Sequence, residues 1–248
     1  MRVAYKRKLL ILFILTFLVV MAFSPRGYTA SLFSSLELSL EKNIGQNCYQ
    51  SIIDQKKVVH LPEEETEHLN AIFKSLVNCC GRKQELEFSL TVVEDETVNA
   101  FALPAGYIFV HTGLLSYVQS DGELAGVLAH EIAHVDRKHS MNAIKRQLGM
   151  SLLLQLILNK KKSKEGLAKV GNVAINMTQL GYGREAEYEA DHYGVYFMEG
   201  AGYQREEILN FWRRIVDQRG GQEDLVILQL FSTHPPTSER IKRIEGLR

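Results

Sequence analysis

The stretch VLAHEIAHVDRKHS (residues 127–140) places three histidines, a glutamate and an aspartate within an apolar pattern that is typical of a buried helix. His130 and His134 are four residues apart, so their side chains lie about 40° apart on one face of a helix. The apolar residues cluster on nearly the opposite side: Leu124, Leu128, Ile132 and Val135. One face can therefore pack while the other presents both imidazoles to one ion.

This spacing favours a catalytic zinc site. Neutral imidazole nitrogens bind Zn²⁺, and a catalytic site takes three protein ligands and keeps one position for water. Glu131 follows the first histidine, where it could take a proton from a zinc-bound water and pass it to the leaving amine. We therefore interpret His130 and His134 as ligands of one Zn²⁺ per chain, and Glu131 as the catalytic base.

The spacing leaves the third ligand open. A continuation with Gly and His at positions 137 and 140 would supply it, but these positions hold Arg137 and Ser140. On a continuous helix His139 lies about 180° from His130, so we expect a capping or partner-binding role for it rather than metal ligation. The segment GYGREAEYEADHYGVYF (181–197) offers carboxylates that could bind the metal or accept a hydrogen bond from a ligand imidazole: Glu187, Glu189 and Asp191.

Around this helix the sequence predicts an α+β fold that is mostly α-helical. Strands are expected at LEFSLTVVED (86–95) and at YIFVH (107–111), and Pro104 suggests an edge position in the sheet. Further helices are expected from Pro62, from Ser120 to about His139, and over 148–158, 184–198 and 205–218, with a short helix after Pro235 and Pro236. Residues 31–60 show no strong period and are expected to form a lead-in segment.

The N-terminus has the order of a secretory signal. Basic residues precede an uncharged apolar run from Leu9 to Phe23, and small residues follow near Ala30. A run of this length is shorter than the roughly 20 residues that a spanning helix needs. Cleavage and retention as a signal anchor both stay open, and either leads us to expect export. The expected organisation is a signal peptide or anchor at 1–30, a lead-in segment at 31–61 and a catalytic domain at 62–248.

Bulk composition excludes some classes of function. Lys plus Arg and Asp plus Glu both number 29, so no global basic field points to nucleic acid.

The chain has three cysteines: Cys48, Cys79 and Cys80. In an oxidising compartment Cys48 could pair with either of the adjacent two, whereas all three could equally be small reduced side chains.

Three motifs together resemble the M48 family of zinc metallopeptidases: HEIAH, then EYEAD followed by Gly194, then STHPPTSERI. The similarity covers roughly residues 62–246, and NAFALPAGYIFVHTGLL also resembles the family's segment before the metal helix. The family includes the HtpX and Ste24 membrane proteases and soluble periplasmic BepA-like enzymes. We expect a BepA-like member, soluble or singly anchored, because nothing past residue 30 is long enough to span a membrane and no tandem-repeat domain follows His234.

The resemblance assigns roles that the spacing leaves open. It implies Glu187 as the third zinc ligand and Asp191 as the carboxylate behind a ligand histidine. The family's His-Pro motif maps onto His234, which would bind the substrate carbonyl or the oxyanion, or occupy the site in a resting state. The resemblance also implies a zincin-like fold, in which a small β-sheet has its edge strand beside the zinc helix. It implies YIFVH (107–111) as the edge to which a substrate peptide adds.

The resemblance therefore implies an exported, periplasmic zinc metalloendopeptidase that hydrolyses misfolded or misassembled envelope proteins in protein quality control. The expected partners are polypeptides and not nucleic acid, and peripheral or single-anchor membrane association is compatible with the N-terminus. The alternative is a zinc-containing periplasmic chaperone or assembly factor with little or no proteolysis. The intact Glu131 argues against it, and structural zinc sites are usually closed by four protein ligands.

Overall fold

The computed structural model describes residues 26–149, 175–176, 181–218, 233–235 and 238–247 of the 248-residue chain. The chain divides into two compact units, Met1–Leu40 and Glu41–Arg248. The described part of the first unit belongs to helix α2 (Arg26–Ile53). The apolar run of the expected signal lies outside the described residues, as does the expected helix at 148–158 beyond Gly149.

Helix α2 replaces much of the expected lead-in segment. In the second unit its buried apolar residues recur every four positions, at Ile44, Cys48 and Ile52. A stripe that is one residue wide carries little amphipathic signal, so the sequence pattern predicts no helix here. None of the three cysteines forms a disulfide in the structure: Cys48, Cys79 and Cys80.

The second unit contains a small mixed sheet. It has three strands in the order β1-β3-β2, namely β1 (Ser89–Val93), β3 (Tyr107–His111) and β2 (Ala100–Ala102). Strand β1 runs parallel to β3, and β2 runs antiparallel to it with Phe101 opposite Phe109. The predicted class, mostly helical with a small sheet, is confirmed.

The edge position expected for YIFVH (107–111) is wrong. Strand β3 pairs with β1 on one side and with β2 on the other, so it is the central strand. Pro104 lies in the short 3₁₀ turn η1 (Pro104–Gly106) before the strand, so its missing N–H removes no bond from the ladder. The edge strand that packs beside the HExxH helix is β2, which is only three residues long.

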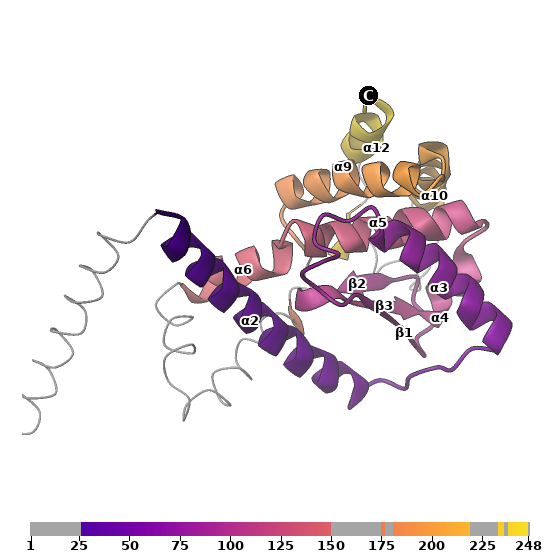
Figure 1. Ribbon diagram of the computed structural model, residues 1–248. Coiled ribbons are helices and arrows are strands. Elements are labelled where there is room, and N and C mark those ends of the chain that lie inside the picture. Colours follow the sequence, from indigo (N-terminus) through magenta and orange to yellow (C-terminus); the bar gives the residue numbers. More distant parts are fainter. Residues whose placement is uncertain (1–25, 150–174, 177–180, 219–232, 236–237, 248) are drawn as a thin grey trace, which may run out of the picture. The chain divides into compact units, whose positions relative to one another are not determined.

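Helix α5 (Asp121–Asp136), which carries the HExxH sequence, is the centre of the second unit. Every residue from Gly122 to Val135 is buried. The sheet lies on one side of α5, and α9 (Arg184–Gly200) and α10 (Arg205–Gln218) lie on the other (Figure 1). Helix α3 (Glu63–Val77) packs against α5 as well. Because α5 is enclosed on several sides, its polar side chains must find partners within the protein.

Helix α5 is shorter than predicted. It ends at Asp136, and Lys138 adopts a left-handed conformation with φ 58° and ψ 32°. A new helix, α6 (His139–Leu148), begins at the next residue. The prediction of a continuous helix to about His139 is therefore wrong, and so is the angle that it implied between His139 and His130.

Helix α9 approaches α5 closely at Gly194. A Cβ atom at this position would lie 3.1 Å from the backbone nitrogen of His130. The absence of a side chain at Gly194 therefore lets the two helices pack with little space between their backbones. This contact sets Glu187 and Asp191, on the same helix, against the histidine face of α5.

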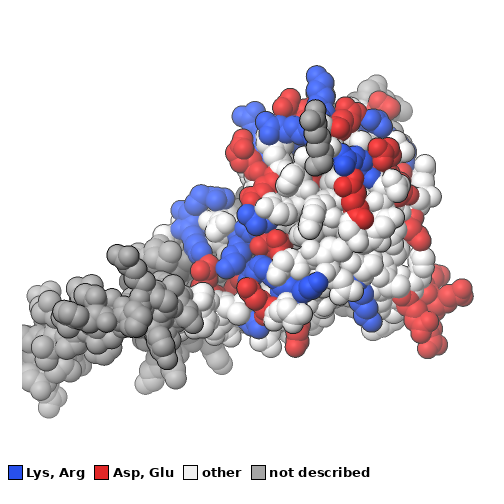
Figure 2. Space-filling model, turned by 45° about the horizontal axis from the view of Figure 1, so that its top comes forward, with Lys and Arg blue, Asp and Glu red and all other residues white. Residues whose placement is uncertain are grey.

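The remaining described helices complete the unit. Helix α4 (Thr112–Tyr117) follows β3, and α12 (Ser238–Glu245) restarts the chain after Pro235 as predicted. On the face shown in Figure 2, acidic and basic side chains are interspersed around an uncharged area, and neither sign dominates. Among the described residues, no helix combines the length and the apolar character needed to cross a bilayer.

Candidate metal centre

The start of α5 is fixed by a side-chain cap at Ser120. Ser120 Oγ accepts a hydrogen bond from the backbone N–H of Glu123 at 3.1 Å, and Asp121 and Glu123 lie in the positive first turn. His130 and His134 follow one helical turn apart on the face that meets α9. The register of the helix therefore carries both imidazoles to the same point.

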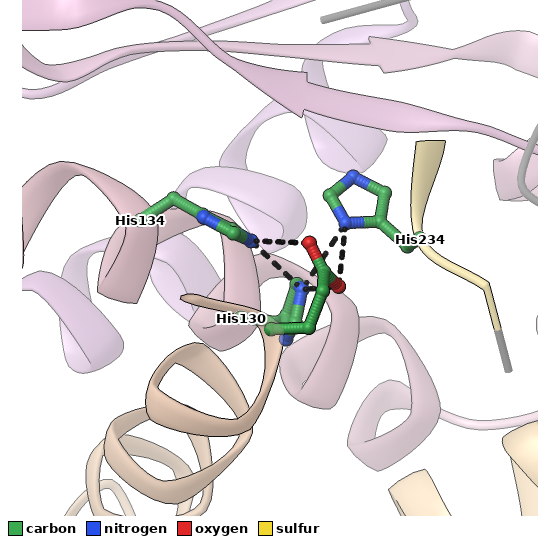
Figure 3. Close-up of side chains that lie close together, drawn as sticks. His130, His134 and His234 are labelled. Atoms are coloured by element: carbon green, nitrogen blue, oxygen red, sulfur yellow. Dashed lines mark hydrogen bonds and ion pairs between the residues drawn. The ribbon is translucent and has the colours of Figure 1, made fainter. Parts of the chain in front are cut away.

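Four side chains that could bind a metal meet there. One donor atom from each of His130, His134, Glu187 and His234 lies within 4.8 Å of all the others, and all four residues are buried. His130 Nε2 lies 3.0 Å from His134 Nε2 and 3.2 Å from His234 Nδ1. Glu187 Oε2 lies 3.4 Å from His130 Nε2 and 3.2 Å from His234 Nδ1. Figure 3 shows the imidazoles of His130, His134 and His234 close together at this point.

The arrangement fits a tetrahedral zinc ion. Ligand atoms at 2.0–2.1 Å from Zn²⁺ are about 3.4 Å apart in a tetrahedron. Five of the six pairs have donor atoms 3.0–3.5 Å apart, the longest of these being His134 Nε2 to Glu187 Oε1, and the sixth pair, His134 and His234, lies within 4.8 Å. Glu187 Oε1 is buried and has no hydrogen-bond donor among the described residues. A bound cation would compensate for the missing donor. Imidazole and carboxylate are also the ligands that zinc accepts.

The basicity of the donors differs with their surroundings. Burial lowers the pKa of His130, but the adjacent carboxylates of Asp191 and Glu187 outweigh it and raise the pKa to about 9. Burial holds the pKa of His134 well below its ordinary value. Burial would raise the pKa of Glu187, yet the neighbouring His234 and His130 hold it well below its usual range. The carboxylate therefore stays charged, as a metal ligand must.

Glu131 lies beside the cluster without joining it. Its Oε1 is 3.2 Å from His234 Nε2, and its Oε2 has no hydrogen-bond partner among the described residues. Burial raises the pKa of Glu131, and a backbone hydrogen bond from Ala102 of the edge strand partly offsets this. A buried carboxylate with a raised pKa is suited to accept a proton and to release it again.

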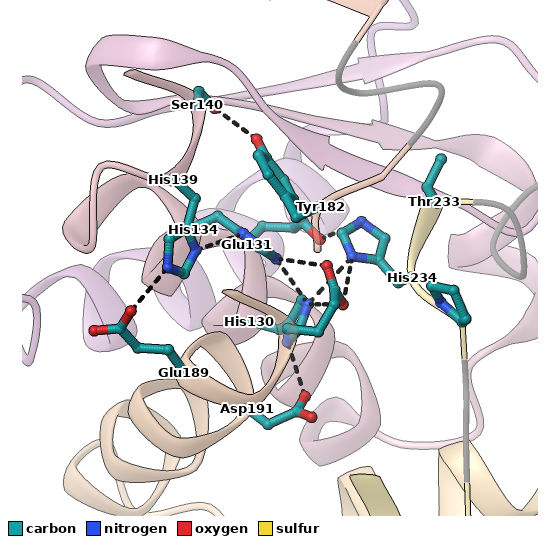
Figure 4. Close-up of polar contacts among 12 residues, drawn as sticks. His130, Glu131, His134, His139, Ser140, Tyr182, Glu189, Asp191, Thr233 and His234 are labelled. Atoms are coloured by element: carbon teal, nitrogen blue, oxygen red, sulfur yellow. Dashed lines mark hydrogen bonds and ion pairs between the residues drawn. The ribbon is translucent and has the colours of Figure 1, made fainter. Parts of the chain in front are cut away.

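Asp191 occupies the position expected behind a ligand histidine. Its Oδ1 lies 3.1 Å from His130 Nδ1, on the side of the ring away from the cluster (Figure 4). Arg240 clamps the same carboxylate, with its Nε 2.7 Å from Oδ2 and its second terminal nitrogen 2.6 Å from Oδ1. Burial would raise the pKa of Asp191, but the Arg240 guanidinium keeps it below its ordinary value. Sequence reasoning missed Arg240, because a single arginine on a short helix gives no signal of burial.

His134 has a different outer partner, which sequence reasoning also missed. His134 Nδ1 lies 2.9 Å from His139 Nδ1, and Tyr182 stacks on the His134 ring with centroids 4.2 Å apart. Glu189 contacts His139 and lies outside the four-residue cluster. The structure therefore brings Glu187 and His234 to the HExxH histidines, and places Glu189 one shell further out.

Comparison with known proteins agrees with this geometry. A model of peptidase family M48 matches residues 63–248. The mitochondrial metalloendopeptidase OMA1 of Schizosaccharomyces pombe is 30% identical over 216 residues, which cover 86% of this chain and 62% of that protein. The putative beta-barrel assembly-enhancing protease of Vibrio cholerae is 33% identical over 167 residues, which cover 62% of this chain and 33% of that protein. The Escherichia coli beta-barrel assembly-enhancing protease is 23% identical over 193 residues, covering 75% of this chain and 39% of its own length. The chain thus spans less than two thirds of the length of these relatives.

Proposed function

Since the chain belongs to peptidase family M48, we propose that it is a zinc metalloendopeptidase. The proposed zinc ligands are His130, His134 and Glu187. The observation that carries the proposal is the buried cluster of donors at zinc-compatible distances, with the Glu131 carboxylate beside it. When bound, the ion would polarise the scissile carbonyl and lower the pKa of water.

The proposed work of the chain's own residues begins at Glu131. Its carboxylate takes a proton from the attacking water and passes it to the leaving amine, as a buried general base with a raised pKa can do. Asp191 holds His130 from behind, so that the ring keeps one tautomer and one orientation.

His234 is proposed to close the site between turnovers. Its Nδ1 lies among the donors of the cluster and its Nε2 lies 3.2 Å from Glu131 Oε1, so it stands where water and substrate would have to enter. Four protein ligands leave no open position, and a catalytic site needs one. We propose that His234 moves aside when substrate binds; the alternative role for this residue is contact with the substrate carbonyl or the oxyanion.

The proposed substrate-binding edge is β2 rather than YIFVH (107–111). The backbone groups of Asn99 and Leu103 bond to β3, so in an antiparallel ladder those of Ala100 and Ala102 point to the other edge. Ala102 also contacts Glu131, which places this edge beside the proposed base. A peptide that pairs with β2 would be read mainly through its main chain, with little regard to sequence.

Such binding suits unfolded chains. We therefore propose misfolded or misassembled envelope proteins as substrates, and the names of the bacterial relatives, which refer to β-barrel assembly, are in line with this. Export to the periplasm, with cleavage or retention of the N-terminal segment, is proposed from the sequence alone. The partners are polypeptides rather than nucleic acid.

The test is Glu131→Gln, which removes the base and keeps the size of the side chain. We expect loss of cleavage of an unfolded substrate such as casein, while zinc content stays near one per chain. His192→Gln, at an exposed position of α9, is the matched control and should retain activity. Undiminished cleavage by Glu131→Gln would overturn the mechanism.

One observation favours the alternative, a zinc-containing chaperone or assembly factor. Four buried donors form a closed set, as in structural zinc sites. A chaperone would suppress the aggregation of unfolded protein equally well with Glu131 or Gln at this position, and it would not cleave. Aggregation and cleavage assays on the same pair of proteins therefore separate the two functions.

A further inference from the structure

The two HExxH histidines are held from behind in different ways. The outer nitrogen of His130 faces a carboxylate, Asp191, that Arg240 clamps. The outer nitrogen of His134 faces another imidazole, that of His139, at 2.9 Å. We propose that His139, together with Glu189, is a positioning residue that fixes the tautomer and the ring orientation of His134. The inference rests on the proposed function, in which His134 is a zinc ligand.

Only one arrangement of protons satisfies this chain of contacts. A His134 ring that binds a metal through Nε2 carries its proton on Nδ1 and donates it outward. His139 Nδ1 must then accept, so the proton of His139 is on Nε2. That nitrogen lies 3.1 Å from Glu189 Oε2 and can donate to it. Arg137 Nε donates to the other oxygen of Glu189 at 2.7 Å and holds the carboxylate in place.

The contacts behind each ligand histidine therefore end in a carboxylate that an arginine holds. Asp191 contacts His130 directly, whereas the imidazole of His139 stands between His134 and Glu189. Figure 4 shows His139 between His134 and Glu189, and Asp191 on the far side of His130. The two ligand rings are thus held from two directions. Since both nitrogens of His139 have polar partners, the residue does more than fill space in the core.

The break after α5 places His139 in this position. Lys138 turns the chain through a left-handed conformation, and His139 begins α6 with its side chain buried. The next residue, Ser140, lies 2.5 Å from the hydroxyl of Tyr182, whose ring stacks on His134 at an interplanar angle of 21°. The turn therefore supports His134 in two ways. His139 contacts the edge of the His134 ring, and Ser140 holds the hydroxyl of Tyr182, whose ring stacks on the face of His134.

The test measures metal binding rather than activity. His139→Leu removes both polar contacts, whereas His139→Asn keeps an amide oxygen near the position of Nδ1. We expect zinc affinity, measured by competition with a chelator, to fall about 10–100-fold in His139→Leu. His139→Asn should recover most of that loss. The visible spectrum of the cobalt-substituted protein should change in His139→Leu, because the orientation of one ligand changes. His192→Leu, at an exposed histidine of α9, should match wild type in both measurements.

The outcomes are distinguishable. Wild-type zinc affinity and an unchanged cobalt spectrum in His139→Leu would overturn the inference. Equal zinc loss in His139→Asn and His139→Leu, with circular dichroism showing both folded, would also overturn it, because the accepting atom would then not matter. His134→Ala tests the premise: zinc binding that survives in this variant would refute the proposed ligand set instead.

Discussion

Two glutamates on α9 hold different positions at the site, although they are two residues apart. Glu187 lies against the imidazoles, whereas Glu189 contacts His139 and Arg137. We expect Glu187→Ala to lose zinc during dialysis against a chelator. Glu189→Ala should weaken zinc binding only about tenfold, as loss of an outer partner does. Zinc per chain after dialysis measures both.

Glu185→Ala is the matched control for these two variants, because Glu185 is exposed in the first turn of α9. It should retain zinc like wild type. Equal retention in Glu187→Ala and Glu189→Ala would mean that the third ligand is assigned to the wrong residue.

His234 gives a second prediction at this scale. If it closes the site between turnovers, His234→Ala should keep its zinc, since three ligands remain, and should cleave casein faster than wild type. Initial rates with zinc-loaded protein measure this. A fall of about 100–1000-fold would instead assign His234 to stabilising the oxyanion, as the loss of such a donor does in other hydrolases.

How far the site could be predicted depends on which contacts are local. His130, Glu131 and His134 follow from helical spacing alone. Spacing could not choose among Glu187, Glu189 and Asp191, because the choice depends on which face of α9 meets α5, and Gly194 fixes that by packing. His139 was placed by assuming a continuous helix, and nothing in the sequence signals the break.

The turn between α5 and α6 places His139 behind His134, so the contact between the two imidazoles depends on it. Lys138 adopts φ 58° there, a conformation that costs a non-glycine residue about 1 kcal/mol or more. We therefore expect Lys138→Gly to raise the free energy of unfolding by about 0.5–1 kcal/mol. Urea unfolding of the metal-free proteins measures this.

The matched control is Lys42→Gly, at an exposed position inside α2. Glycine within a helix costs about 0.5–1 kcal/mol, so this variant should be destabilised. Both changes replace lysine by glycine, but we expect the free energy of unfolding to rise in Lys138→Gly and to fall in Lys42→Gly. If Lys138→Gly were destabilised as much as Lys42→Gly, the turn would not be left-handed in solution.

Whether an element could be predicted depended on how clear its apolar pattern is, since α2 has 28 residues but only a narrow apolar stripe. Helix α3 begins directly after Pro62 as predicted, and α9 and α10 were predicted close to their observed bounds. Strand β2 has only three residues, and a period of two cannot be recognised over so few. Without β2, the sequence left YIFVH (107–111) at the edge of the sheet, although tertiary pairing puts it at the centre.

The stability of the whole molecule should depend on pH through His111, at the end of the central strand. Its side chain is fully buried, and burial lowers its pKa from 6.5 to about 4 even though Asp95 lies 3.6 Å away. The other groups that face it are Thr97, whose hydroxyl lies 2.7 Å from Nδ1, and Lys56, whose charge also lowers the pKa. The imidazole is therefore neutral in the folded protein at pH 5 and mostly charged in the unfolded chain.

The sign of the effect follows from this difference. Above pH 6.5 neither state binds the proton, and between pH 6.5 and 4 only the unfolded state does, so stability falls as the pH is lowered through this window. The shift corresponds to a loss of about 2 kcal/mol between pH 7.5 and 5. Urea unfolding of metal-free wild type and His111→Asn at both pH values isolates the contribution, because the other titrating groups are common to both. We expect the variant to lose about 2 kcal/mol less than wild type over this interval. An equal loss in both proteins would mean that His111 is not held neutral, and that acid sensitivity arises elsewhere in the fold.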